Sequence, residues 1–314
     1  MNYNIKKYSR RQFIGTTALG TALAFSTPGS FSQAADLRKY EPNLRDRLWM
    51  WGHGPNTLWG YAENYKIPDG NRIDMADAID SMGIPNVCVI RWLGQPEPPF
   101  DGYVKQFHKT KRVAWSIIDS APQSFEQKKR MAFELSDQMP NFTGFFLDDY
   151  FNDLAAPPEG AGGEENYSHG ILPVDGLREL RDEMKSLKRP NDLSVVLYSH
   201  QLYPRIKRYI DYCDVVSFWT WHATDLAALQ DNFKRYRELV PDKPTLLGTY
   251  MWDFGNCKPI TMELMKLQLD FALEQFKEGQ IEGMIFHCTP LVGLDLEAVE
   301  YSRKWIAEYG DLMR

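Results

Sequence analysis

Residues 141–151, NFTGFFLDDYF, combine a helix end, a buried strand and two acids within one short stretch. Pro140 and Asn141 are typical of the end of a helix. The apolar residues 144–147 then predict a strand that is buried on both faces. This strand ends in Asp148 and Asp149, and ligands of parallel α/β proteins bind outside the carboxyl ends of strands. An isolated Asp-Asp pair equally often caps a loop, so its meaning depends on how the other strands end.

Strands and helices alternate eight times from residue 48 onward. This alternation predicts a parallel sheet with right-handed crossovers. Eight units in roughly 280 residues predict a single closed (β/α)8 TIM barrel. An open doubly wound sheet is the alternative, but no glycine-rich phosphate-binding motif follows the first strand. The expected strands are residues 48–53, 87–92, 113–119, 141–151, 193–200, 215–222, 245–253 and 283–288, and the expected helices are 71–82, 101–110, 124–139, 174–187, 202–212, 225–240, 261–278 and 296–309.

The N-terminal segment has the features of an export signal. A basic stretch precedes a weakly apolar run, and small residues at 32–35 form a cleavage site. The sequence Ser-Arg-Arg-Gln-Phe at residues 9–13 resembles the twin-arginine export signal. We therefore expect residues 1–34 to be a cleaved signal peptide, residues 35–314 to form the catalytic barrel, and the protein to be periplasmic or secreted. A basic amphipathic tail is the alternative, and the apolar run is too short to span a membrane.

Charge and cysteine usage restrict the partners of the mature chain. Residues 1–34 carry four basic and no acidic side chains, so their removal takes the net charge from −6 to −10. Such an acidic protein is a poor partner for nucleic acid or an anionic membrane. Four cysteines do not form a disulfide framework in a chain of this length. We expect all four to be free, with a Cys257–Cys288 bond as the alternative.

Polar and aromatic side chains gather where the predicted strands end. The carboxyl ends of the strands build the active site in this fold, with contributions from several strands. A lone His at a strand end is more often structural, but four of them on one face beside a carboxylate pair favour a site. The residues at these ends are His53, Arg91, Trp92, Asp119, Asp148, Asp149, His200, Trp219, Trp221, His222, Tyr250, Trp252, Asp253 and His287.

Residues 144–149, Gly-Phe-Phe-Leu-Asp-Asp, together with the aromatic residue that follows, resemble the fourth strand of (β/α)8 glycoside hydrolases, which carries an acid at its end. Chitinase-type and hexosaminidase-type barrels place paired acids there. The resemblance covers the eight-unit layout and this one strand, without identifying a family. The strand departs from the chitinase pattern, in which acids stand at alternate positions and end in Glu. Its acids are adjacent, and it contains no Glu. The Asn-Glu pair of the large clan with acids on strands four and seven is also missing, although Asp253 ends the seventh strand.

The resemblance implies hydrolysis of a glycosidic bond in an oligo- or polysaccharide, with no cofactor. This chemistry needs one protonated carboxyl to release its proton to the leaving oxygen, and one ionised carboxylate. Two neighbouring acids separate these roles because each raises the pKa of the other. Successive strand residues point to opposite faces, so we expect only one of the pair to react. We assign Asp149 as the general acid and Asp148 as its partner, with the reverse order as the alternative. Asp253 or Asp119 is the expected second carboxylate.

The remaining residues at the strand ends are expected to bind the sugar. We expect Tyr250, His200 and His287 to bind hydroxyl groups. Core packing is the alternative for every Trp. The other expected contacts are an aromatic platform of Trp92, Trp219, Trp221 and Trp252, with His53, Arg91, Asp119 and His222 beside it.

Two other functions stay open. A metal-dependent hydrolase or isomerase would use His53, His200, His222 and His287 with an Asp as Zn²⁺ ligands. The first strand contains no His-x-His, however, and the fourth strand contains no Lys that could be carboxylated to serve as a bridging ligand. The third possibility is a sugar-binding barrel without catalytic activity.

Overall fold

The computed structural model describes residues 43–55, 65–68, 70, 72–92, 94–153 and 168–314. The expected signal peptide at residues 1–34 lies outside this part of the chain. Within the described residues, no helix combines the length and the apolar character that crossing a membrane requires.

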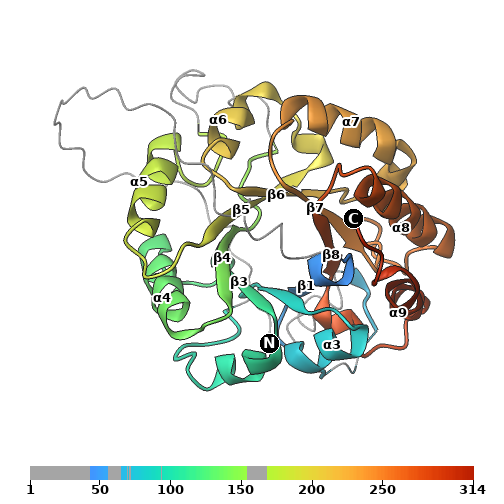
Figure 1. Cartoon of the computed structure of the whole chain (residues 1–314), viewed down its shortest axis with the longest axis horizontal. Coiled ribbons are helices and arrows are strands. Elements are labelled where there is room, and N and C mark those ends of the chain that lie inside the picture. The colour runs from blue at the N-terminus through green and yellow to red at the C-terminus, as the bar shows by residue number, and fades with distance from the viewer. Residues whose placement is uncertain (1–42, 56–64, 69, 71, 93, 154–167) are drawn as a thin grey trace. The chain divides into compact units, whose positions relative to one another are not determined.

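Eight parallel strands close into a barrel in the order in which they follow one another in the chain (Figure 1). The closing pair, β1 with β8, keeps the parallel register from Leu48↔Met284 to Trp51↔His287. This arrangement confirms the predicted single (β/α)8 barrel. The strands are β1 (Leu48–Gly52), β2 (Asn86–Val89), β3 (Arg112–Ile118), β4 (Phe142–Leu147), β5 (Asp192–Tyr198), β6 (Val215–Trp219), β7 (Thr245–Tyr250) and β8 (Gly283–His287).

The helices surround the strands, as Figure 1 shows, and their ends follow local sequence signals. Ser124 caps α4, because its side chain accepts from the Gln127 N–H while the Gln127 side chain accepts from the Ser124 N–H. Gly83 ends α3 in the left-handed conformation, with φ of 65°. The α-helices are α3 (Met75–Met82), α4 (Phe125–Gln138), α5 (Val174–Met184), α6 (Lys207–Ile210), α7 (Leu229–Leu239), α8 (Met262–Lys277) and α9 (Glu297–Tyr309).

Three expected helices are replaced wholly or partly by 3₁₀ turns; the one expected at 225–240 begins with the turn η8 (Ala223–Ala228), which α7 follows. The segment expected at 101–110 is the 3₁₀ helix η5 (Tyr103–Lys109), and aromatic and β-branched residues such as Tyr103 and Val104 have modest helix propensity. The helix expected at 202–212 is the turn η7 (Pro204–Ile206) followed by the short α6. Pro204 has no backbone N–H to donate, so it fits only at the first position of a helical segment. It therefore begins η7.

Large aromatic side chains fill the barrel. Trp51 meets Phe146 and Trp219 edge-on, with ring centroids 5.7 and 5.3 Å apart. Their packing closes the barrel interior and forms the floor on which the candidate site is built. All four cysteines are free, as expected.

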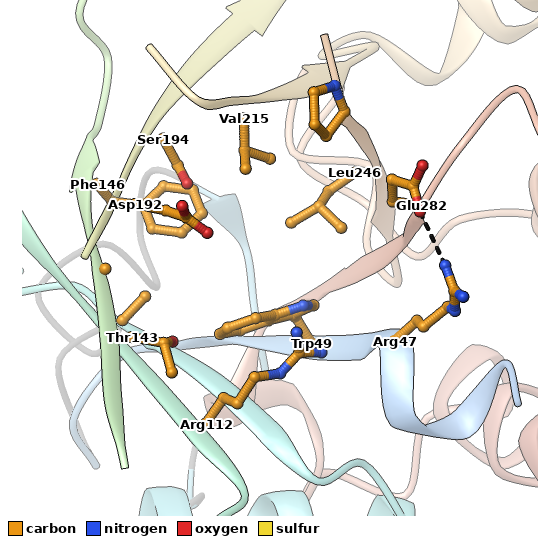
Figure 2. A pocket seen from close by; sticks show the side chains of 13 residues that line it. Arg47, Trp49, Arg112, Thr143, Phe146, Asp192, Ser194, Val215, Leu246 and Glu282 are labelled. Atoms are coloured by element: carbon orange, nitrogen blue, oxygen red, sulfur yellow. Dashed lines mark hydrogen bonds and ion pairs between the residues drawn. The ribbon is translucent and has the colours of Figure 1, made fainter. Parts of the chain in front are cut away.

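A cavity of about 80 Å³ lies at the amino ends of the strands (Figure 2). Arg112 lies over the ring of Trp49 at 4.7 Å, and Arg47 pairs with Glu282 at 2.8 Å. Arg112 also donates to Asn86 Oδ1 at 3.1 Å. These side chains engage one another across the end of the barrel, which is the face that serves stability in this fold.

Candidate active site

The carboxyl ends of the strands surround a second pocket of about 80 Å³. Acidic side chains occupy one part of its wall and aromatic side chains most of the rest. The pocket combines eight residues that were expected at the site with five others, which is the arrangement of an apolar binding site with a few polar groups. The described residues that line it are Trp51, His53, Tyr65, Trp92, Asp148, Asp149, Val196, Tyr198, Trp219, Trp221, Tyr250, Phe254 and His287.

Asp148 and Asp149 both line this pocket although they are consecutive. Strand β4 ends at Leu147, so the alternation of side chains along a strand no longer applies to either acid. Asp149 adopts a φ of 43°, in the left-handed region that Asp tolerates better than most residues. The tight turn after β4 thus presents two adjacent carboxyl groups to one pocket.

The two acids differ in their electrostatic surroundings. Burial raises the pKa of Asp148 well above its usual range, and the charges of Asp149 and Asp119 raise it further. Burial also raises the pKa of Asp149, although part of its side chain is exposed, and the Tyr198 hydrogen bond opposes this shift. That bond runs from the Tyr198 hydroxyl to Asp149 Oδ1 at 2.8 Å. A donor favours the ionised carboxylate, so Asp149 loses its proton before Asp148 does.

Tyr198 belongs to a short chain of polar contacts. Its ring stacks on His200 at 5.4 Å with an interplanar angle of 12°, and its hydroxyl interacts with Tyr250. His200 Nε2 lies 3.1 Å from Asp153 Oδ1. His200 stands outside the pocket lining; it packs on Tyr198, and its charge opposes the rise in the pKa of Asp149.

Trp219 and Trp221 occupy different depths of the pocket. Trp219 is buried, and its Nε1 donates to Ser217 Oγ at 2.9 Å. A Cβ on Gly248 would lie 2.0 Å from its ring, so only glycine leaves room for the indole there. Trp221 is half-buried and meets Tyr250 edge-on at 5.7 Å. Trp219 thus forms the floor, whereas Trp221 offers part of its ring to a ligand.

Asp253 and Trp252 follow β7 but do not line the pocket. The Asp253 carboxylate accepts from the Asn256 side chain at 3.0 and 2.9 Å and from the Asn256 N–H at 3.1 Å. Trp252 is buried and donates from Nε1 to the Tyr65 carbonyl at 3.0 Å. Both side chains stabilise the loop after β7.

Asp119 and Arg91 also lie outside the lining. Asp119 forms a buried ion pair with Lys128 at 2.8 Å, so it acts on the pocket only through its charge on Asp148. Arg91 donates to the carbonyl groups of Pro96 and Gly94 at 3.0 and 3.2 Å. It therefore holds the loop after β2.

The four histidines expected as an alternative metal set do not converge. His222 is exposed, and its ring lies against Gly255, where an added Cβ would meet Nδ1 at 2.3 Å. His200 lies beside Asp153. Only His53 and His287 are neighbours, with ring centroids 5.6 Å apart. Burial lowers the pKa of His53 to about 4 and that of His287 well below its usual value, so both imidazoles are neutral at neutral pH.

Five lining residues were not expected from the sequence. Trp51 and Tyr198 lie two positions before His53 and His200, and the two-residue period of a strand places such pairs on one face. That period was the available signal. Val196 lies one further step along β5. Tyr65 and Phe254 lie in loops, where no periodicity indicates their direction. The five are Trp51, Tyr65, Val196, Tyr198 and Phe254.

No family model and no curated protein matches the chain. Among solved structures, active domain 2 of a thermostable chitinase from Pyrococcus furiosus, complexed with chito-oligosaccharides, is similar with a TM-score of 0.51 and 13% identity, over 87% of this chain and 99% of that one. A β-galactosidase from the psychrophilic Marinomonas ef1 has a TM-score of 0.52 and 11% identity, over 83% of this chain and 59% of that one. The catalytic domain of a hyperthermophilic chitinase from Pyrococcus furiosus has a TM-score of 0.50 and 12% identity, over 86% of this chain and 99% of that one. At these identities the likeness is one of fold, the (β/α)8 barrel on which these glycoside hydrolases are built.

Proposed function

We propose that the protein is an exported hydrolase that cleaves glycosidic bonds with Asp148 and Asp149. One observation carries the proposal: two adjacent carboxyl groups face one aromatic pocket, and among the described residues a tyrosine hydroxyl donates a hydrogen bond to Asp149 but not to Asp148. A pair with one protonated and one ionised member is what acid-assisted cleavage of a glycosidic bond requires.

In this mechanism Asp148 is the general acid. Its raised pKa keeps the proton on the carboxyl until the leaving oxygen takes it. Asp149 stays ionised beside the Tyr198 hydroxyl and stabilises the positive charge that develops on the sugar ring. This order is the reverse of the one expected from the sequence, because Asp148 is the more deeply buried acid and Asp149 has the hydrogen-bond donor.

The aromatic walls supply the sugar contacts. Trp92 and Trp221 are half-buried lining residues, so part of each indole is open to the pocket. Flat aromatic faces bury the apolar side of a pyranose ring, while Tyr250 and His287 offer polar atoms to its hydroxyl groups. Export rests on the twin-arginine sequence at residues 9–13, which places the substrate outside the cytoplasm.

A hydrolysis assay tests the proposal. The purified protein is incubated with chito-oligosaccharides, which are named for a similar chitinase barrel, with aryl β-galactosides as substrates for a β-galactosidase, and with further oligosaccharides. Released reducing ends or phenols are measured. We expect turnover of at least one class, and its loss in the double variant Asp148→Asn/Asp149→Asn. The control is Asp182→Asn, which changes an exposed acid paired with Lys185 on α5 and keeps full activity. Turnover that survives in the double variant contradicts the proposal, and binding without turnover identifies a sugar-binding barrel instead.

A further inference from the structure

Two imidazoles and a thiol converge where β1 and β8 end. One ligating atom of each of His53, His287 and Cys288 lies within 4.8 Å of those of the other two. Both histidines line the pocket, whereas Cys288 is fully buried. Imidazole nitrogen and thiolate sulfur together form the donor set that Zn²⁺ prefers over oxygen-binding cations.

The backbone fixes the spacing of these donors. The His53 N–H donates to Thr289 Oγ1 at 3.0 Å, and the same hydroxyl donates to the His53 carbonyl at 2.7 Å. This pair of bonds ties His53 to the residue that follows Cys288. On the strands just before, Trp51 is in register with His287. The three donors therefore lie where β1 and β8 pair to close the barrel. A preorganised site requires ligands on rigid elements of this kind.

One buried ring nitrogen of each histidine is available as a ligand. Nδ1 of His53 and Nδ1 of His287 are buried and have no hydrogen-bond partner among the described residues. The His53 ring also interacts with the backbone of Ile90. A histidine that binds a metal commonly donates its other ring N–H to a backbone carbonyl, which leaves the first nitrogen as a bare lone pair.

Aromatic rings pack against His287 in this cluster. His287 stacks on Trp51 with centroids 6.0 Å apart and an angle of 28°, and Phe254 meets it edge-on at 4.7 Å. This packing restricts rotation of the imidazole. An apolar shell of this kind controls the access of solvent to a bound ion.

We propose that His53, His287 and Cys288 bind one Zn²⁺ ion in the wall of the pocket. Three protein ligands with the fourth position left to water or to a substrate atom is the arrangement of open zinc sites. The proposal goes beyond the glycosidase function, because the acid pair at the end of β4 requires no metal. Failure of either proposal leaves the other standing.

Titration of the full chain with Co²⁺, after removal of metal with a chelator, tests this site. Co²⁺ reports on a zinc site because a thiolate ligand gives a charge-transfer band in the near ultraviolet. We expect one equivalent to bind with this band, and Zn²⁺ to displace it. Cys288→Ser should abolish the band, and His287→Gln should weaken binding by more than about 100-fold, since loss of even an outer-shell partner costs roughly 10–100-fold. The matched control is Cys213→Ser, which changes another buried free thiol and keeps the band.

Two results overturn the site. One is the absence of stoichiometric Co²⁺ binding to the wild-type chain. The other is a wild-type charge-transfer band in a folded Cys288→Ser variant, which would place the thiolate ligand elsewhere. If circular dichroism shows that Cys288→Ser does not fold, His287→Gln decides, and unchanged Co²⁺ affinity in that variant rejects the proposal.

Discussion

The hydroxyl of Tyr198, at the end of β5, donates a hydrogen bond of 2.8 Å to Oδ1 of Asp149, just beyond the end of β4. This bond joins neighbouring strands across the mouth of the barrel. It distinguishes two acids that are adjacent in the sequence, because Asp148 accepts no such bond from a side chain of the described residues and is raised in pKa by Asp149 itself. The proposed division of roles between the acids rests on this contact and on the deeper burial of Asp148.

Removing the contact should shift the pH dependence of hydrolysis. In Tyr198→Phe the ionised form of Asp149 loses its donor, so its pKa rises and the acidic limb of the kcat/KM profile moves to higher pH. We expect a shift of about one to two pH units, since a hydrogen bond to a charged group contributes ~1.5–3 kcal/mol and one unit corresponds to ~1.4 kcal/mol. Tyr236→Phe, which removes a hydroxyl bonded to Thr245 far from the pocket, is the control with an unchanged profile. An unshifted acidic limb in Tyr198→Phe would show that Asp149 is not the ionised partner.

Trp221, just after β6, and Trp252, just after β7, should respond differently to truncation. Trp221→Ala should weaken sugar binding with a small change in melting temperature, because part of the ring faces the pocket. Trp252→Ala should cost about 3–5 kcal/mol of stability and leave affinity unchanged, since this ring is buried outside the pocket. Calorimetric titration and thermal unfolding of both variants check the contrast. Equal losses of affinity in the two variants would show that Trp252 also belongs to the binding surface.

Replacement of Asp148 should make the protein more stable at neutral pH. A folded pKa above the unfolded value means that the native state binds more protons, so this carboxyl destabilises the fold increasingly as pH rises above its unfolded pKa of about 3.9. Asp148→Asn removes that cost. We expect a higher melting temperature than the wild type at about pH 7, and nearly equal values at about pH 3.

The control for this comparison is Asp182→Asn, since pairing with Lys185 lowers the pKa of that exposed acid and its loss brings no stabilisation. A melting temperature of Asp148→Asn that is lower than that of the wild type at about pH 7, but not at about pH 3, would mean that the ionised carboxylate is stabilised in the native state.

Export should depend on the paired arginines. In the variant Arg10→Lys/Arg11→Lys the charge is kept but the twin-arginine core is lost, so the full-length chain should accumulate in the cytoplasm. Lys6→Arg/Lys7→Arg, which alters the basic stretch before the core, should be exported normally and begin near Ala35. Cell fractionation and N-terminal sequencing measure both outcomes, and normal secretion of the first variant contradicts the signal assignment.

The barrel was predictable because buried parallel strands are continuous apolar runs, of which residues 144–147 are an example. The type of each helix was harder to predict. At Pro204, for example, one long predicted helix is instead a 3₁₀ turn followed by the short α6. Side-chain direction beyond a strand end depends on the turn that follows. The turn at Asp149 brings its carboxylate into the pocket, whereas the Asp253 carboxylate binds Asn256 within the loop after β7. Tertiary contacts decide between these outcomes, and the sequence pattern is the same for both.

The dependence on the leaving group tests the roles of Asp148 and Asp149 most directly. Turnover of Asp148→Asn and Asp149→Asn is compared on an oligosaccharide, which has a poor leaving group, and on an activated aryl glycoside, whose leaving group needs no proton. We predict that Asp148→Asn lowers turnover of the oligosaccharide by ~10²–10⁴-fold and that of the aryl glycoside much less. Asp149→Asn should impair both substrates alike, because stabilisation of the sugar cation does not depend on the leaving group. Selective loss on the oligosaccharide in Asp149→Asn, with equal losses in Asp148→Asn, would contradict this assignment.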